Sequence, residues 1–165
     1  PSISADGRYV AFGSDSWGTT HSHVWVRDRQ NGTTERVSVN SSGTPGNDYS
    51  FSPSISADGR YVAFASDASN LVIGDSNGSR DHFVRDRQDG TTVRVSVDSS
   101  GAQAGGEMFH LIGLATWISA DGSCVAFYSD ATDLVVGDTN GWLDVFVRDR
   151  CEPAKIGRAS CRERV

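Results

Sequence analysis

One stretch of this chain occurs three times, and this repeat constrains the fold more than any other feature of the sequence. The segment Pro53–Phe64 reads PSISADGRYVAF. The same residues open the chain at Pro1–Phe12, and a divergent copy occupies Ile118–Phe127. A second block, Val-Arg-Asp-Arg, follows each copy, at residues 26–29, 84–87 and 147–150. Two blocks that recur in the same order, about 50 to 60 residues apart, indicate a tandem array of supersecondary units.

Each unit reads as four short strands. In the second unit we expect them at residues 54–56, 60–64, 82–84 and 93–97. Asp58-Gly59 and Asp89-Gly90 supply hairpin turns between them, because Asp and Gly tolerate the backbone angles that tight turns need. No window shows a helical period. The second strand is apolar on both faces, so the sheet must be covered on both sides, as in blades stacked around an axis.

These motifs resemble the TolB-like, WD40-like (PD40) family of β-propeller repeats, over most of residues 1–150. Two positions depart from the family pattern, since His82 replaces an aliphatic residue and Cys124 replaces a tyrosine. The resemblance implies an all-β fold, a fragment of a β-propeller built from four-stranded antiparallel blades. The remaining blades are expected outside this sequence, because a closed ring has roughly four to eight. The predicted units are two full blades, 1–52 and 53–117 with a long linker, and a partial third, 118–153, without its outer strand.

The last eleven residues, 155–165, differ in composition from everything before them. They resemble the translation of a common short-read sequencing adapter, and they contain Lys155, the only lysine of the chain. We therefore expect a non-native, disordered tail that packs on nothing, and we exclude it from functional reasoning.

The charge and composition exclude several classes of function. The net charge is −6, although four of the 15 basic residues lie in the tail. This acidic balance argues against a nucleic-acid partner, which requires a basic face. No apolar run is long enough to span a membrane. The cysteines outside the tail, Cys124 and Cys151, give neither a disulfide framework nor zinc-ligand spacing.

The strand order predicts where a binding site lies. In an antiparallel blade the loop between the second and third strands (the b–c loop) and the connection to the next blade (the d–a connection) share one rim. The tight turns occupy the other rim. Loops on a rigid scaffold commonly carry binding sites. One connection contains an apolar insertion, Met108–Trp117, which either packs between blades or forms an exposed patch. The long segments are 14–22, 40–52, 66–80, 98–116 and 129–143.

Two b–c loops share the pattern Asp-x-Asn-Gly-x-x-Asp, which places oxygen ligands as in the first half of calcium loops. No glutamate follows to complete such a loop. The alternative is a turn in which the last aspartate accepts hydrogen bonds from loop amides. His21 and His23 lack a third metal ligand with fitting spacing and read as polar residues at a strand edge. The candidate calcium ligands are Asp75, Asn77 and Asp81 in one loop and Asp138, Asn140 and Asp144 in the other.

No catalytic motif is visible in its expected context. The sequence Gly74–Gly78 matches Gly-x-Ser-x-Gly, but it lies in a turn-rich loop and not between a strand and a helix, and the chain has no phosphate-binding glycine loop. We predict a non-catalytic binding or scaffolding module whose protein or polysaccharide partner is held by the long loops. One alternative is the substrate-gating propeller of a larger, prolyl-oligopeptidase-like hydrolase. Another is a calcium-stabilised adhesion module of the cell surface. Apart from calcium we expect no cofactor, and the family resemblance implies a bacterial protein of the periplasm or the extracellular space.

Overall fold

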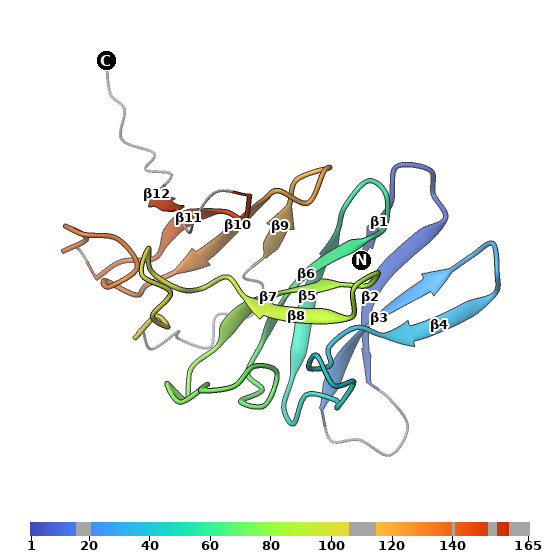
Figure 1. Ribbon diagram of the computed structural model, residues 1–165, viewed down its shortest axis with the longest axis horizontal. Coiled ribbons are helices and arrows are strands. Elements are labelled where there is room, and N and C mark those ends of the chain that lie inside the picture. Colours follow the sequence, from blue (N-terminus) through green and yellow to red (C-terminus); the bar gives the residue numbers. More distant parts are fainter. Residues whose placement is uncertain (16–20, 106–114, 140, 152–154, 159–165) are drawn as a thin grey trace.

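The protein is described by a computed structural model over residues 1–15, 21–105, 115–139, 141–151 and 155–158. Within these ranges the regular elements are β-strands, and they form three four-stranded antiparallel sheets (Figure 1). The all-β class predicted from the repeat is therefore confirmed. In each sheet the strands lie side by side in their order along the chain.

The three sheets correspond to the three repeat units. The first contains β1 (Ser2–Ile3), β2 (Tyr9–Asp15), β3 (Ser22–Asp28) and β4 (Thr33–Arg36). The second contains β5 (Ser50–Ile55), β6 (Tyr61–Ser66), β7 (Asp81–Asp86) and β8 (Thr91–Arg94). The third contains β9 (Thr116–Ile118), β10 (Cys124–Ser129), β11 (Asp144–Asp149) and β12 (Lys155–Arg158).

The Ala-Asp-Gly sequence closes the first hairpin of every unit. In the second unit Asp58 Oδ1 accepts hydrogen bonds from Ser56 Oγ (2.6 Å) and from the Arg60 amide (2.9 Å). Gly59 has a φ of +75°, a left-handed conformation that L side chains rarely adopt. These bonds fix the turn before β6 begins, so the short motif sets the hairpin locally.

Two strand boundaries differ from the sequence prediction. The outer strand β8 ends at Arg94, because the next residues leave the sheet edge and enter the core, where Val95 is buried. The Ser96 hydroxyl then accepts a hydrogen bond from the His82 amide (3.1 Å). The inner strand β5 begins earlier than expected, at Ser50, and its register with β6 shifts between Phe51 and Ser54. Pro53 lies in this bulge, where a missing N–H is tolerated.

The third sheet is complete, which corrects the prediction of a partial blade followed by a disordered tail. Lys155–Arg158 pairs with β11 in the register Phe146↔Arg158 to Asp149↔Lys155, and Ile156 is buried. An edge strand exposes backbone groups that any extended segment can satisfy. Pairing of this kind needs no repeat motif in the added segment, which is why the sequence did not reveal β12.

The core consists of two apolar clusters, one between each pair of neighbouring sheets. Phe64 and Phe83 belong to the first cluster, and Phe127 and Phe146 to the second, all fully buried. The three sheets follow one another in chain order, each packed against the next (Figure 1). Strand β5 of the second sheet contacts both β1 of the first and β9 of the third. The second sheet is thus covered on both faces.

Backbone hydrogen bonds also join the sheets at their tight turns. The Ala5 amide donates to the Ala57 carbonyl (2.9 Å), and the Ala57 amide donates to the Ala120 carbonyl (2.8 Å). We call each of these contacts between neighbouring sheets a joint. Because both joints use the equivalent amide and carbonyl, the first and second units are arranged relative to each other as the second and third units are. The repeat in sequence therefore becomes a repeat in space.

Candidate functional site

The antiparallel strand order gathers the long loops at one end of the sheets. We call this end the long-loop rim and define it by the described segments 40–50, 66–80, 98–105 and 129–139. The tight turns lie at the opposite end, toward the upper right in Figure 1, and the long loops toward the lower left. The sequence-predicted location of the loops is therefore the one that the topology produces.

The b–c loops of the second and third units are each fixed to the d–a connection of the preceding sheet. In the second unit Leu71 is buried, and the Asn70 side chain accepts a hydrogen bond from the Asn47 amide (2.9 Å) and donates one to the Pro45 carbonyl (2.9 Å). In the third unit Asp133 lies at the position of Asn70 and accepts a hydrogen bond from the Gly105 amide (2.8 Å). The rim is consequently a set of anchored loops.

The anchored loops display apolar side chains to solvent. Ile73 and Val136 occupy the same position in the two b–c loops, two residues after the buried leucine, and both are fully exposed. Trp142 and Leu143, near the end of the third-unit loop, are also exposed. Single exposed aliphatic side chains are common, but one that is repeated at the same loop position in two units indicates an interaction site.

The rim also carries an excess of negative charge. Its four segments contain seven aspartates and a single basic residue, Arg80. Arg80 is neutralised by an ion pair with Asp67 (2.8 Å). By contrast, arginines of the tight-turn end pair with carboxylates there, as Arg60 does with Asp86 (2.6 Å). Asp75 is likewise paired, with Arg94 of β8 (3.6 Å). The remaining aspartates give the long-loop rim a net negative charge, which favours cationic partners.

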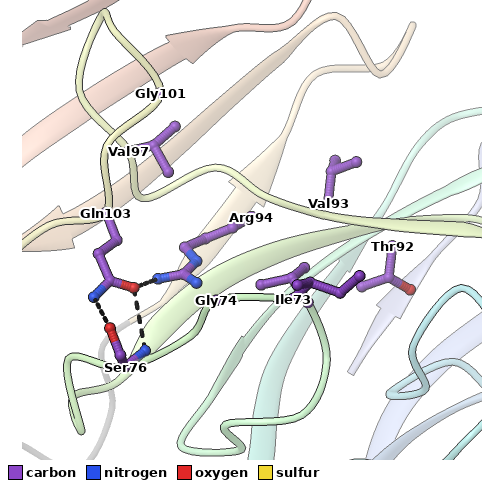
Figure 2. Close-up of a pocket in the computed structure, with 10 residues that line it drawn as sticks. Ile73, Gly74, Ser76, Thr92, Val93, Arg94, Val97, Gly101 and Gln103 are labelled. Carbon is purple, nitrogen blue, oxygen red and sulfur yellow. Dashed lines mark hydrogen bonds between the residues drawn. The ribbon is translucent and has the colours of Figure 1, made fainter.

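An open groove of about 420 Å³ lies beside Ile73 (Figure 2). One side is the b–c loop of the second unit, and the other is β8 with the connection that follows it. Gln103 holds the two sides together, because its Oε1 accepts a hydrogen bond from Arg94 (2.6 Å) and its Nε2 donates one to Ser76 Oγ (3.0 Å). The exposed Ile73 and Val93 contribute apolar surface to the lining of the groove.

The three calcium ligands predicted in the second unit do come together, but around a guanidinium group. Arg94 Nη1 lies 3.2 Å from Asp81 Oδ2 and 3.6 Å from Asp75 Oδ1. Asp81 also accepts hydrogen bonds from Ser96 Oγ (2.5 Å) and from Asn77 Nδ2 (3.2 Å). The arginine thus supplies the positive charge that a cation would bring, which favours the turn alternative over calcium in this loop.

Burial dominates the electrostatics of this cluster. It raises the pKa of Asp81 to about 6, and the Ser96 hydrogen bond and the Arg94 charge oppose it only in part. Burial likewise raises the pKa of Asp75. Metal ligation favours ionised carboxylates, and burial opposes ionisation at both positions. Over the described ranges, no group of three or more His, Cys, Asp or Glu side chains is arranged to hold a metal ion.

The third-unit loop is described only in part. Asp138 is buried and Asp144 is half-buried at the start of β11, but Asn140 lies outside the described residues. The apolar insertion is likewise outside them from Met108 to Leu114. Calcium binding in this loop stays a prediction.

Sequence reasoning missed the partners of Asp81. Arg94 and Ser96 belong to an Arg-Val-Ser-Val segment that the first unit also contains, beginning at Arg36. In the first unit His23 lies where Asp81 lies in the second, and it is 3.4 Å from Ser38 Oγ, the counterpart of Ser96. The recurrence of this segment was the available signal for a buried polar cluster in the first two blades.

No family model and no curated protein matches this chain. Solved structures do match. TolB from Acinetobacter baumannii gives a TM-score of 0.59 at 20% identity, covering 98% of this chain and 32% of TolB. A putative TolB from Agrobacterium tumefaciens gives 0.55 at 16% identity, covering 95% and 47%. The β-propeller domain of the Trilobed protease from Pyrococcus furiosus gives 0.54 at 10% identity, covering 98% and 42%.

The chain therefore spans about a third of the length of the Acinetobacter TolB that it resembles. At identities of 20% or less, these similarities concern the fold. They agree with the three antiparallel sheets and with the repeated joints between them. The chain has the fold of a TolB-like β-propeller segment, built from four-stranded antiparallel blades.

Proposed function

We propose that this chain is a non-catalytic binding module of a β-propeller and that the long-loop rim holds its partner. The observation that carries the proposal is the pair Ile73 and Val136, two exposed aliphatic side chains at one repeat position on loops that buried leucines anchor. Anchored loops lose little conformational entropy on binding, so contacts made by these side chains contribute to affinity.

The charge of the rim indicates the chemistry of the partner. With seven aspartates and one arginine in its segments, the rim attracts a partner surface that combines basic and apolar side chains. This favours a protein over a neutral polysaccharide and argues against nucleic acid. Binding of this kind should weaken as salt screens the charges.

The proposal is tested with an array of synthetic peptides that vary in charge and apolar content, beside an array of purified polysaccharides. We expect peptides rich in both basic and apolar residues to bind. Ile73→Ser with Val136→Ser should weaken binding about tenfold or more, since a buried aliphatic side chain contributes about 1.5 to 3 kcal/mol. Ile3→Ser, an exposed aliphatic position away from the rim, is the matched control. Equal losses in both variants, or binding by no probe, would refute the proposal.

A second candidate is the substrate-gating propeller of a larger hydrolase. The similarity to the propeller domain of the Pyrococcus protease favours it. Sequencing the gene on both sides of this segment distinguishes the two candidates. A Gly-x-Ser-x-Gly motif on a strand, turn and helix downstream would favour the hydrolase. A continuous series of further repeats would favour the binding module.

The cellular location belongs to the same proposal. The described part of the chain contains no helix that is long and apolar enough to cross a membrane. We place the protein in the periplasm or outside the cell on the family resemblance. A cell-surface adhesion role would additionally require calcium in the third-unit loop, for which Asp138 and Asp144 are the described candidate ligands.

A further inference from the structure

The outer strand of the second sheet, β8, has one edge that pairs with no strand in the described part of the chain. The connection from the first sheet covers the middle of this edge. There the Thr92 amide donates a hydrogen bond to Ser41 Oγ (3.0 Å), and Ser41 Oγ donates one to the Thr92 carbonyl (3.5 Å). The main-chain groups of Thr92 therefore point away from β7.

The main chain of Arg94 faces the same side. In an antiparallel strand, residues two apart direct their amides and carbonyls alike. The next residue bonds inward, since the Val95 amide donates to the His82 carbonyl (2.8 Å). Arg94 also lines the groove beside Ile73. An amide donor and a carbonyl acceptor of an edge strand thus open onto this groove.

The side chains of β8 do not protect this edge from pairing. Native edge strands commonly carry charged side chains that discourage the addition of a further strand. In the first sheet the equivalent position holds Glu35, whereas in β8 it holds Val93, which is 44% exposed. Figure 2 shows Val93 and Ile73 among the residues that line the groove. The groove therefore combines main-chain hydrogen-bonding groups with exposed aliphatic surface.

The charges next to the groove favour a basic ligand. The Arg94 guanidinium lies 3.6 Å from an Asp75 oxygen and 3.2 Å from an Asp81 oxygen. One cation thus faces two carboxylates, and their ionised forms leave an excess of negative charge. A ligand with basic side chains reduces this imbalance.

We propose that the groove binds an extended peptide segment of a partner protein as an added β-strand with alternating aliphatic and basic side chains. The main chain of this segment pairs with the amide and carbonyl of Arg94, and its aliphatic side chains contact Ile73 and Val93. In this mode of recognition main-chain hydrogen bonds give affinity and alternate side chains give specificity. The inference rests on the proposed function, because it names the form in which a protein partner is bound at the long-loop rim.

The probe is an acetylated and amidated peptide of sequence Lys-Val-Lys-Val-Lys, added to the full chain. Hydrogen exchange of individual amides, followed by NMR, locates the bound peptide. We expect the Arg94 amide to exchange about tenfold or more slowly in the complex, because a new hydrogen bond protects it. The Thr92 amide is the internal control, since it is already bonded to Ser41 and should change little.

Methylated peptides test whether the ligand is a strand. A strand turns alternate amides toward its neighbour. N-methylation of the two valines and N-methylation of the central and last lysines should therefore differ in effect. One of these sets should lose binding about tenfold or more, and the other should bind like the parent peptide.

A protein variant tests the apolar contact. Val93→Ser should weaken binding of the parent peptide, whereas Ile3→Ser, at an exposed aliphatic position away from the rim, is the matched control. Equal effects of these two variants would contradict the proposal.

Three other results would overturn the added strand: a parent peptide that does not bind, unchanged exchange at Arg94 in the complex, or two methylated sets that behave alike. The proposed function survives each of them if another peptide of the array binds in a manner that depends on Ile73 and Val136. Absence of binding by every peptide and polysaccharide would refute both.

Discussion

His82 of β7 shares a hydrogen bond of 2.7 Å with Thr116 of β9, across the boundary between the second and third sheets. Its other ring nitrogen, Nε2, lies 3.1 Å from the Tyr128 carbonyl. A carbonyl only accepts, so Nε2 carries the proton and Nδ1 accepts the threonine hydroxyl hydrogen. The ring also packs 4.7 Å from that of Phe127. This histidine is therefore a satisfied, neutral part of the joint.

The burial of His82 makes stability depend on pH. Burial lowers its pKa to about 4, from 6.5 when exposed. Between these two pKa values the unfolded chain binds a proton that the folded chain does not. As far as His82 determines it, the free energy of unfolding is therefore highest above about pH 6.5 and falls as the pH approaches 4. The slope is at most about 1.4 kcal/mol per pH unit. Asp81 acts in the opposite direction over part of this window, because its pKa is raised to about 6.

The variant His82→Val isolates this contribution, since valine occupies the equivalent positions Val24 and Val145. Urea unfolding of both proteins at pH 7.5 and pH 5 measures it. We expect the wild type to lose stability relative to the variant at the lower pH. The Asp81 contribution is common to both proteins and cancels. A stability difference that is the same at both pH values would contradict this account of the buried histidine.

Close packing at the first joint predicts a large effect of one methyl group. In Gly59→Ala the new Cβ meets the Tyr9 ring at 2.2 Å and the backbone has a φ of +75°. Overpacking and left-handed strain together should cost about 3 kcal/mol or more. Gly43→Ala, with a similar φ and open space, should cost only about 1 kcal/mol. Denaturant unfolding of the two variants provides the comparison, and equal losses would show that the ring contact is not tight.

Calcium binding is tested loop by loop. If the third-unit loop binds calcium, the ion at a hundred times its dissociation constant should add about 2.7 kcal/mol, and Asp144→Asn should remove the gain. Asp81→Asn should show no calcium-dependent effect, because Arg94 already lies 3.2 Å from that carboxylate. Melting curves with millimolar calcium and with chelator measure both. A wild type that melts identically in the two conditions would exclude the ion.

The outer strand of the third sheet makes a testable contribution to stability. Deleting residues 155–165 removes β12 and the buried Ile156, which should cost about 2 kcal/mol or more. Deleting only residues 159–165 keeps the strand and is the control. The measurement is the urea midpoint of each protein. Unchanged stability after the longer deletion would show that β12 does not hold the sheet together, as the composition of the tail had suggested.

Much of this fold was predictable because its determinants are local. The Asp58-Gly59 turn closes on itself through hydrogen bonds within five residues. β-Branched and aromatic residues identified the two central strands of each sheet, and the repeat placed them at corresponding positions in each unit. The boundaries that failed, at β5 and β8, are set by contacts outside the strand, since Val95 leaves the sheet to fill the core.

The candidate site was predictable in its location but not in its chemistry. Strand order alone places the long loops on one rim, whatever their side chains. The sequence correctly grouped Asp75 with Asp81 but gave no reason to add Arg94 of β8, whose guanidinium lies 3.6 Å from Asp75 and 3.2 Å from Asp81. Likewise, Ile73 and Leu71 are both aliphatic, and only the structure distinguishes the exposed one from the anchor.

By itself, the sequence determined the strands, the turns and the number of units, because each depends on residues close together in the chain. Tertiary structure alone decided which groups meet across units: Tyr9 on Gly59, Arg94 between two aspartates, and β12 on the free edge of β11. Such contacts arise from residues far apart in sequence, and their geometry follows from how the sheets stack. The pairing of β12 with β11 depends on backbone groups that every residue possesses, so no side-chain pattern predicts it.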